Sequence, residues 1–166
     1  LLLCILGFKY WIRVMGAIAF AFCSYNVILI DVGHVTKMYD IALMPAVLAG
    51  IVLTYRGRLL SGAALTALAT AMLIYNNHLQ IIYYTLIMVL CLAAGAFVHA
   101  YREKELPRFF KASALLAVAG ALAVMTSMDS LLILNEYAGY SMRGSKSELT
   151  LDQDDITQKK SSGLEI

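Results

Sequence analysis

Long apolar runs alternate with short polar connections along most of this sequence. A membrane hydrocarbon core about 30 Å thick needs roughly 17–25 mostly apolar residues in helical form. After an apolar stub at 1–8, we expect membrane spans at about 14–30, 39–55, 59–75, 80–100 and 112–133. The second span is the weakest candidate because its uninterrupted apolar part is short and contains Pro45. The pattern predicts an all-α polytopic membrane bundle of about five spans plus a truncated N-terminal one.

The composition agrees with a membrane-embedded block that is followed by a polar segment. Apolar residues make up 61% of the 166 positions and charged residues only 14%, whereas average soluble domains are about 45–50% apolar and about 25% charged. Residues 1–134 carry 14 charged side chains, and residues 135–166 carry the other 10. We therefore predict a transmembrane helical block at 1–134 and an extracytoplasmic segment at 135–166 that belongs to a truncated loop.

The beginning of the chain argues against a signal peptide, and the net charge argues against a nucleic-acid-binding protein. The sequence starts inside an apolar run without a Met, and it lacks the basic region and cleavage site of a signal peptide. We interpret the chain as a fragment of a longer protein. The net charge is only +2, and no basic patch of the kind that binds nucleic acid is present.

Basic residues in the connections predict the orientation of the spans, because cytoplasmic loops are enriched in Lys and Arg. The loops at 31–38 and 76–79 contain only Lys37, whereas the alternate loops contain eight basic residues. We therefore expect 31–38, 76–79 and the C-terminal tail to lie outside the cytoplasm. The eight cytoplasmic residues are Lys9, Arg13, Arg56, Arg58, Arg102, Lys104, Arg108 and Lys111.

The first outer connection carries a group of ionisable residues with a regular spacing. Asp31, His34, Lys37 and Asp40 recur every three residues, so in a continuous helix they would lean toward one face. Such a face is a candidate binding surface. The alternative interpretation is that these residues are solvated loop charges.

The second outer connection is rich in directional hydrogen-bonding groups. Asn76, Asn77, His78 and Gln80 stand at a helix entry, and amides and imidazoles of this kind suit a sugar or phosphate ligand. Helix capping and hydrogen bonding between helices is an equally strong alternative. Further candidates on this side are Tyr84, which also fits an interfacial aromatic role, and Arg143 of the tail. Because the connections are short, we expect both polar groups to converge in one outward-facing cleft.

The sequence contains no cofactor motif. Cys4, Cys23 and Cys91 lie in apolar runs without paired spacing, which is typical of free thiols packed as small hydrophobic side chains. His34 and His78 do not have a recognised zinc spacing. We therefore expect no resident metal, although the residue types alone leave a divalent metal open.

Four segments of the chain have a distinctive order of residues. They are 16–25, Gly33-His34-Val35-Thr36-Lys37, Asn77-His78-Leu79-Gln80-Ile81-Ile82-Tyr83-Tyr84 and 143–150. Together they resemble the YfhO family of bacterial multi-spanning membrane proteins, in the form found in Bacteroidetes. The family's usual Gly-His-Asn-Thr-Lys loop has Val35 in place of Asn here, and the tail segment has an additional Ser145.

The resemblance implies a glycosyltransferase-like membrane fold of the GT-C type in the bacterial cytoplasmic membrane. It also implies transfer of a sugar from a polyprenyl-phosphate donor at the outer face. Enzymes of this type generally carry their catalytic Asp or Glu in the first large outer loop, which would lie upstream of Leu1. We therefore expect no catalytic base in this fragment, which alone would be inactive, and we expect His34, Lys37, Asn77, His78 and Gln80 to bind the donor.

Two other classes of function remain open at the level of sequence. A transporter or flippase for a lipid-linked or small polar substrate would place polar residues within several spans, and Ser24, Asn26, Thr66 and Thr70 are the main examples here. A non-catalytic scaffold would use the polar loops only to cap helices. The polar loops are common to all three hypotheses.

Overall fold

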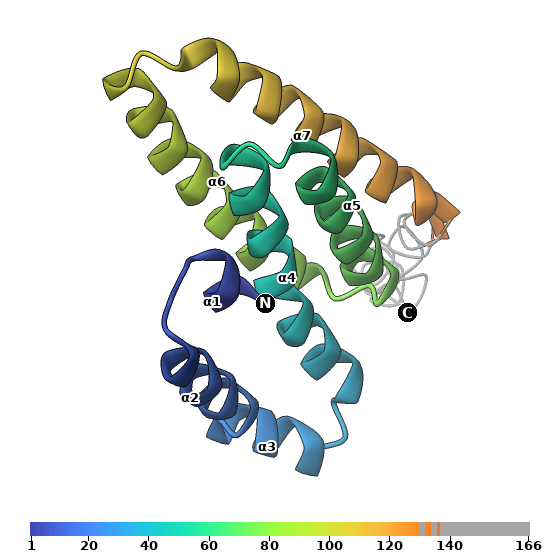
Figure 1. Cartoon of the computed structure of the whole chain (residues 1–166). Coiled ribbons are helices and arrows are strands. Elements are labelled where there is room, and N and C mark those ends of the chain that lie inside the picture. The colour runs from blue at the N-terminus through green and yellow to red at the C-terminus, as the bar shows by residue number, and fades with distance from the viewer. Residues whose placement is uncertain (130–131, 134–135, 137–166) are drawn as a thin grey trace, which may run out of the picture. The chain divides into compact units, whose positions relative to one another are not determined.

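The computed structural model describes residues 1–129, 132–133 and 136. Within this part, Leu1–Met128 forms a compact unit of helices without a β-strand, so the all-α prediction is confirmed for it. The predicted segment 135–166 lies outside the described residues except for position 136. The helices are α1 (Leu2–Ile5), α2 (Tyr10–Ala21), α3 (Ser24–Asp31), α4 (Val35–Tyr55), α5 (Leu59–Tyr75), α6 (Leu79–Arg102) and α7 (Leu106–Thr126) (Figure 1).

Four helical segments are long and apolar enough to cross a membrane: Tyr10–Asp31, which combines α2 and α3, and the helices α4, α6 and α7. The helix α5 has 17 residues and is shorter than these. The predicted second span corresponds to α4, which begins at Val35 and runs for 21 residues with Pro45 inside it, and its mean hydropathy of 1.6 is the lowest of the four.

The closest contact in the unit is the antiparallel crossing of α4 and α5. A Cβ atom at Gly50 would lie 2.8 Å from the backbone nitrogen of Thr66 and would also strike its hydroxyl. A Cβ atom at Gly62 would lie 2.6 Å from the backbone nitrogen of Thr54. Only glycine allows two backbones to approach this closely, as in small-residue interfaces between membrane helices.

The two threonines of this crossing have the same arrangement. The hydroxyl of Thr54 donates to the carbonyl of Gly50 at 2.9 Å, and that of Thr66 donates to the carbonyl of Gly62 at 2.9 Å. Each buried hydroxyl is thereby satisfied within its own helix, and its oxygen and the threonine backbone lie against the glycine of the other helix. The crossing is therefore a symmetric pair of Gly-x-x-x-Thr segments.

The helix α7 packs against α5 through small residues, and α6 packs against α4 and α7 (Figure 1). Ala112, Ala119 and Ala123 are the buried residues of α7, and their spacing of seven and four places them on one helix face. The hydroxyls of Tyr55 and Ser113 lie 3.1 Å apart. The core therefore centres on α4 and α5.

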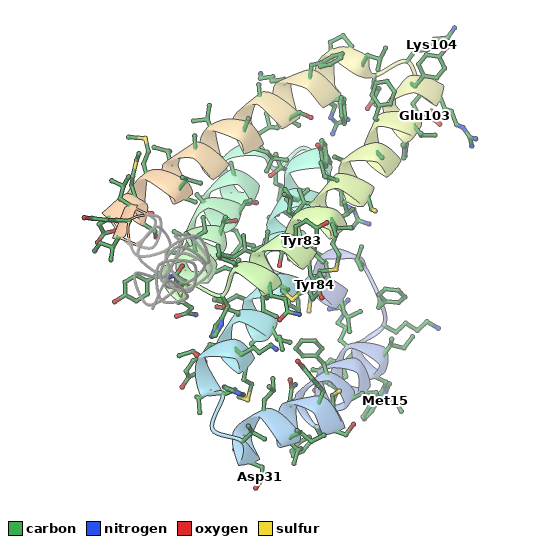
Figure 2. All side chains as sticks on the ribbon, turned by 180° about the vertical axis from the view of Figure 1, so that it is seen from behind. Met15, Asp31, Tyr83, Tyr84, Glu103 and Lys104 are labelled. Atoms are coloured by element: carbon green, nitrogen blue, oxygen red, sulfur yellow. The ribbon has the colours of Figure 1, made fainter. Side chains whose placement is uncertain are left out.

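The predicted span at 14–30 is a helix with a break. The helix α2 ends at Ala21 and α3 begins at Ser24. The side-chain amide of Asn26 donates to the carbonyl of Phe20 at 2.8 Å, so one carbonyl freed by the break has a partner. The helix α2 has no buried residue, and Met15 on it is exposed (Figure 2).

The predicted connection at 101–111 is mostly helical. Only Glu103–Glu105 separate α6 from α7, and Glu103 and Lys104 lie at the tip of this turn (Figure 2). The helix α7 begins at Leu106 because Pro107 suits the first helical turn, where its missing N–H has no helical partner to lose. Arg108 thus belongs to α7 and forms an ion pair of 3.1 Å with Glu105.

Replacing Gly50 with Ala should lower the free energy of unfolding in detergent micelles by about 2 kcal/mol or more, because the new methyl group overpacks a backbone contact. Denaturant unfolding followed by circular dichroism measures this loss. The matched control is Gly120→Ala, since nothing lies within 4 Å of a Cβ atom at Gly120. Equal stability of the two variants would contradict the close crossing.

Candidate functional site

The two predicted outer connections lie together at one end of the helices. The first is the turn Val32–His34 between α3 and α4, and the second is the turn Asn76–His78 between α5 and α6. The hydroxyl of Thr36 lies 2.8 Å from Nε2 of His78. We call the group Thr36, Asp40, Asn76, Asn77 and His78 the polar turn cluster.

Asp40 occupies the centre of the polar turn cluster. The residue is fully buried in the first turns of α4, and its Oδ1 accepts a hydrogen bond of 2.7 Å from the side-chain amide of Asn76. The interpretation of Asp40 as a solvated loop charge is therefore wrong. A buried carboxylate is expensive unless it is hydrogen-bonded, so the Asn76 amide is part of what makes this position tolerable.

Two acceptor atoms in the cluster have no hydrogen-bond partner among the described residues. They are Oδ2 of Asp40 and Oδ1 of Asn77, and both are inaccessible to solvent. Buried polar atoms nearly always find a partner, and leaving one without a donor costs free energy. The cluster therefore has unused capacity to accept hydrogen bonds from a donor such as a hydroxyl group.

Backbone geometry holds the turn Asn76–His78 in position. Asn77 adopts φ 59°, a left-handed conformation that Asn tolerates better than most residues. His78 follows as the residue before α6, where Thr36 orients its ring.

The first connection is a tight helix ending, not a continuous helix. Gly33 has φ 80°, and the N–H of His34 bonds to the carbonyl of Leu29 at 2.8 Å, which is the hydrogen-bond pattern of a Schellman motif. Asp31 and Asp40 are therefore not in one continuous helix, and they do not share a helix face. Asp31 ends α3, is exposed, and lies at the far tip of that helix (Figure 2).

The other predicted site residues that the structure describes make no hydrogen bond to the cluster. The ammonium of Lys37 is 6.0 Å from the ring centroid of Tyr25, at the outer limit of a cation–π contact. His34 is exposed before the first turn of α4. On the surface of α6, the amide of Gln80 donates to the hydroxyl of Tyr84 at 3.1 Å, and Arg143 lies outside the described residues.

A cavity of about 640 Å³ adjoins the cluster at Asn76. Its walls come from α4, α5 and the end of α7, and they are mostly apolar. Ser127 and Tyr39 contribute polar groups. A ligand in this cavity would contact apolar surface with Asn76 at one side.

Sequence reasoning did not identify the pairing of Asp40 with Asn76 or the contact between Thr36 and His78. One signal for the burial of Asp40 is visible in the sequence. Asp40, Val47, Ile51 and Thr54 follow each other at spacings of seven, four and three, and all four are buried. This spacing places Asp40 on the core face of α4.

The part of the chain that the structure describes contains no group of three or more His, Cys, Asp or Glu side chains placed to hold a metal ion. Cys4, Cys23 and Cys91 are free and exposed. Comparison of the chain with protein-family models, with curated proteins and with solved structures finds no match.

Replacing Asn76 with Leu should destabilise the protein by about 3 kcal/mol, because it leaves a buried carboxylate without its donor. The double variant that also carries Asp40→Leu should be more stable than Asn76→Leu alone, since no buried charge remains. Denaturant unfolding of the two single variants and the double variant gives the coupling energy, expected at about 1 kcal/mol or more. Strictly additive losses would show that the two residues do not interact.

Proposed function

We propose that this chain is part of a polytopic membrane protein of the GT-C glycosyltransferase type, which uses a polyprenyl-phosphate sugar at the outer face of a bacterial cytoplasmic membrane. The observation that carries the proposal is the polar turn cluster, with its two unpartnered buried oxygens at one end of long apolar helices. The resemblance to the YfhO family supplies the reaction class.

The exposed surface supports the membrane location. Large apolar side chains on several helices, such as Leu60, Trp11 and Met15, are 81%, 74% and 70% exposed, as expected for helices whose surfaces face lipid. The side chain of Arg108, in α7, lies beside Gly57 of the turn between α4 and α5. The turns with many basic residues are therefore grouped together, away from the polar turn cluster.

In the proposed reaction, an acceptor hydroxyl attacks the anomeric carbon of the lipid-linked sugar. The bond from that carbon to the phosphate oxygen breaks, and its electron pair stays on the phosphate. The hydroxyl proton passes to a carboxylate acting as general base, which we do not assign to a residue of this chain. Asp40 instead acts as a positioning residue, because its bond to Asn76 holds the turn that carries Asn77 and His78.

The residues around the turn have chemistry suited to a sugar phosphate. In the proposed complex, His78 donates to a phosphate or sugar oxygen, and a local movement of the turn exposes Oδ1 of Asn77, which is inaccessible in the structure, so that it accepts a hydrogen bond from a sugar hydroxyl. Lys37 supplies a cation for the departing phosphate, which a positive charge stabilises. The apolar cavity beside Asn76 offers space for the first part of a polyprenyl chain.

The alternative is a transporter or flippase for a lipid-linked or small polar substrate. The break between α2 and α3 favours it, because discontinuous membrane helices are typical of transporter binding sites. Asn26, however, uses its amide to satisfy the carbonyl of Phe20. Substrate flux through reconstituted protein without any transfer of sugar would favour this alternative.

The proposed orientation of the helices in the membrane predicts which positions react with a membrane-impermeant thiol reagent in intact cells. In a variant without native cysteines, Val32→Cys should be labelled from outside, and Lys104→Cys should be labelled only after the membrane is permeabilised. Both positions are exposed turn residues, which makes them a matched pair. Labelling of Lys104→Cys alone from outside would reverse the orientation, and release of the protein by alkaline extraction would refute the membrane location.

Replacing His78 or Lys37 with Ala should lower the amount of surface glycolipid or glycopolymer made by the producing cells by about tenfold or more, as expected for loss of a group that stabilises a transition state. Lys104→Ala in the distant turn is the control and should have no effect. Membrane levels of each variant are measured by immunoblot. Normal glycan levels with His78→Ala and Lys37→Ala would refute the site.

A further inference from the structure

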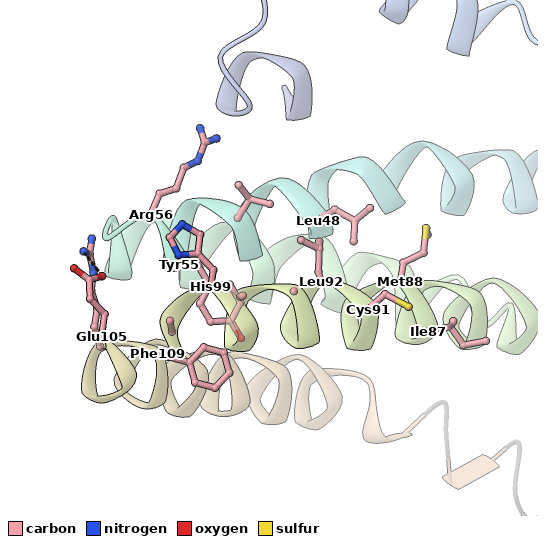
Figure 3. Close-up of a pocket in the computed structure, with 15 residues that line it drawn as sticks. Leu48, Tyr55, Arg56, Ile87, Met88, Cys91, Leu92, His99, Glu105 and Phe109 are labelled. Carbon is pink, nitrogen blue, oxygen red and sulfur yellow. Dashed lines mark hydrogen bonds and ion pairs between the residues drawn. The ribbon is translucent and has the colours of Figure 1, made fainter. Parts of the chain in front are cut away.

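A second cavity, of about 870 Å³, lies between α4, α6 and the beginning of α7. We call it the α4–α6 groove. Most of its length is lined by apolar side chains, including Leu48, Ile87, Met88 and Leu92, as Figure 3 shows. Its other end, near the turn Glu103–Glu105, carries polar groups. The groove is therefore amphipathic along its length and is separate from the polar turn cluster.

Arg108 and His99 form the polar end of the groove. Arg108 pairs with Glu105 at 3.1 Å, but both side chains are about half exposed, so this ion pair is weak. A guanidinium has five N–H donors, and the pair with Glu105 is the one hydrogen bond that Arg108 makes through its side chain among the described residues. Arg56 lies at the rim and points away from the groove toward α1 (Figure 3), where it donates to the carbonyl of Ile5.

Aromatic rings close the groove beside these polar groups. Tyr55 and Phe109 stack with ring centroids 5.4 Å apart, and Phe97 packs edge-on against Phe109 at 5.5 Å. Tyr55 is fixed further through its contact with Ser113. Such a ring cluster gives the polar end a defined wall, and aromatic residues are common at the level of lipid headgroups.

The apolar part of the groove has the length of one membrane leaflet. The apolar lining on α6 runs from Ile87 to Ala96, nine residues further along, which corresponds to about 14 Å at 1.5 Å per residue. Half of the hydrocarbon core is about 15 Å. A single acyl chain laid along α6 from the polar end would therefore stay within one leaflet.

We propose that the α4–α6 groove binds an anionic glycerophospholipid, with its phosphate at Arg108 and His99 and one acyl chain between α4 and α6. Charge selects an anionic headgroup, because this end carries Arg56, Arg58, Arg102, Lys104, Arg108 and Lys111 but only Glu103 and Glu105 as acidic residues within 55–111. Basic pockets between membrane helices bind anionic headgroups in this way. The inference depends on the proposed membrane location but not on the proposed transfer reaction.

Native mass spectrometry of the full chain in detergent tests this proposal. The protein is first delipidated and then titrated with dioleoylphosphatidylglycerol or dioleoylphosphatidylcholine. We expect one tightly bound phosphatidylglycerol and only weak, unsaturated binding of phosphatidylcholine. Arg108→Gln should weaken phosphatidylglycerol binding by about fivefold, the factor expected for one basic residue near a headgroup, whereas Lys37→Gln, which removes one positive charge at the opposite end of α4, should change it little.

Three more substitutions distinguish binding in the groove from nonspecific binding of lipid. Gly95 lines the groove, and nothing lies within 4 Å of a Cβ atom placed there, so Gly95→Leu should fill the groove without disturbing the helix. Gly120→Leu is its matched control on α7, since Gly120 also has open space and does not line the groove. Glu105→Gln frees Arg108 and should strengthen phosphatidylglycerol binding.

The outcomes are distinct. Loss of binding in Gly95→Leu but not in Gly120→Leu, with weaker binding in Arg108→Gln, supports the groove. Equal binding of the two lipids, or unchanged binding in Gly95→Leu, overturns it and leaves the proposed transferase site untouched. Normal lipid binding together with normal surface glycan in His78→Ala refutes the transferase proposal and keeps the groove.

Discussion

The backbone contact between α4 and α5 at Gly50 and Gly62 determines where the polar turn cluster forms. Gly50 lies against Thr66, and Gly62 lies against Thr54. Asp40 lies ten residues before Gly50, and Asn76 lies ten residues after Thr66, so both are about 15 Å from the contact between Gly50 and Thr66. At this distance the side chains of Asp40 and Asn76 form their hydrogen bond. A shift of the crossing by one helical turn would separate this pair by several ångströms and leave the carboxylate buried without its donor. The packing of small residues and the polar cluster thus depend on one register.

The two ends of the unit differ in the burial and the partners of their charged side chains. At the polar turn cluster, the buried carboxyl group of Asp40 has an amide partner, and the ammonium of Lys37 lies 6.0 Å from the ring centroid of Tyr25. At the opposite end, cationic side chains outnumber acidic ones and are mostly exposed. Buried acceptor oxygens suit recognition of hydroxyl groups, which donate hydrogen bonds, whereas an exposed cationic surface suits anionic headgroups.

The sequence is sufficient to predict helices but not their pairing. Apolar runs locate the long helices, because the length of an apolar run and the hydrogen bonds within one helix depend only on the local sequence. The sequence identifies Gly33 as a residue that ends a helix. The spacing of seven residues between Asp40 and Val47 also places both on the core face of α4. The sequence does not predict the partner of Asp40, because several Ala and Gly residues between 62 and 71 are small enough to be the contact of Gly50. Only the three-dimensional crossing selects one register and, with it, Asn76.

The same crossing explains why a groove opens on the other side of α4. Its closely packed face, with Gly50, Ile51 and Thr54, is turned toward α5. The helix α6 buries only Ile81 and Thr85, both next to the polar turn cluster, and beyond Thr85 it has no fully buried residue. Because Gly95 and Ala96 offer almost no side-chain volume there, α6 cannot fill the space beside α4. The register that brings Asp40 to Asn76 thus leaves an apolar groove along the rest of α6, and in a bilayer the molecules available to fill it are lipids.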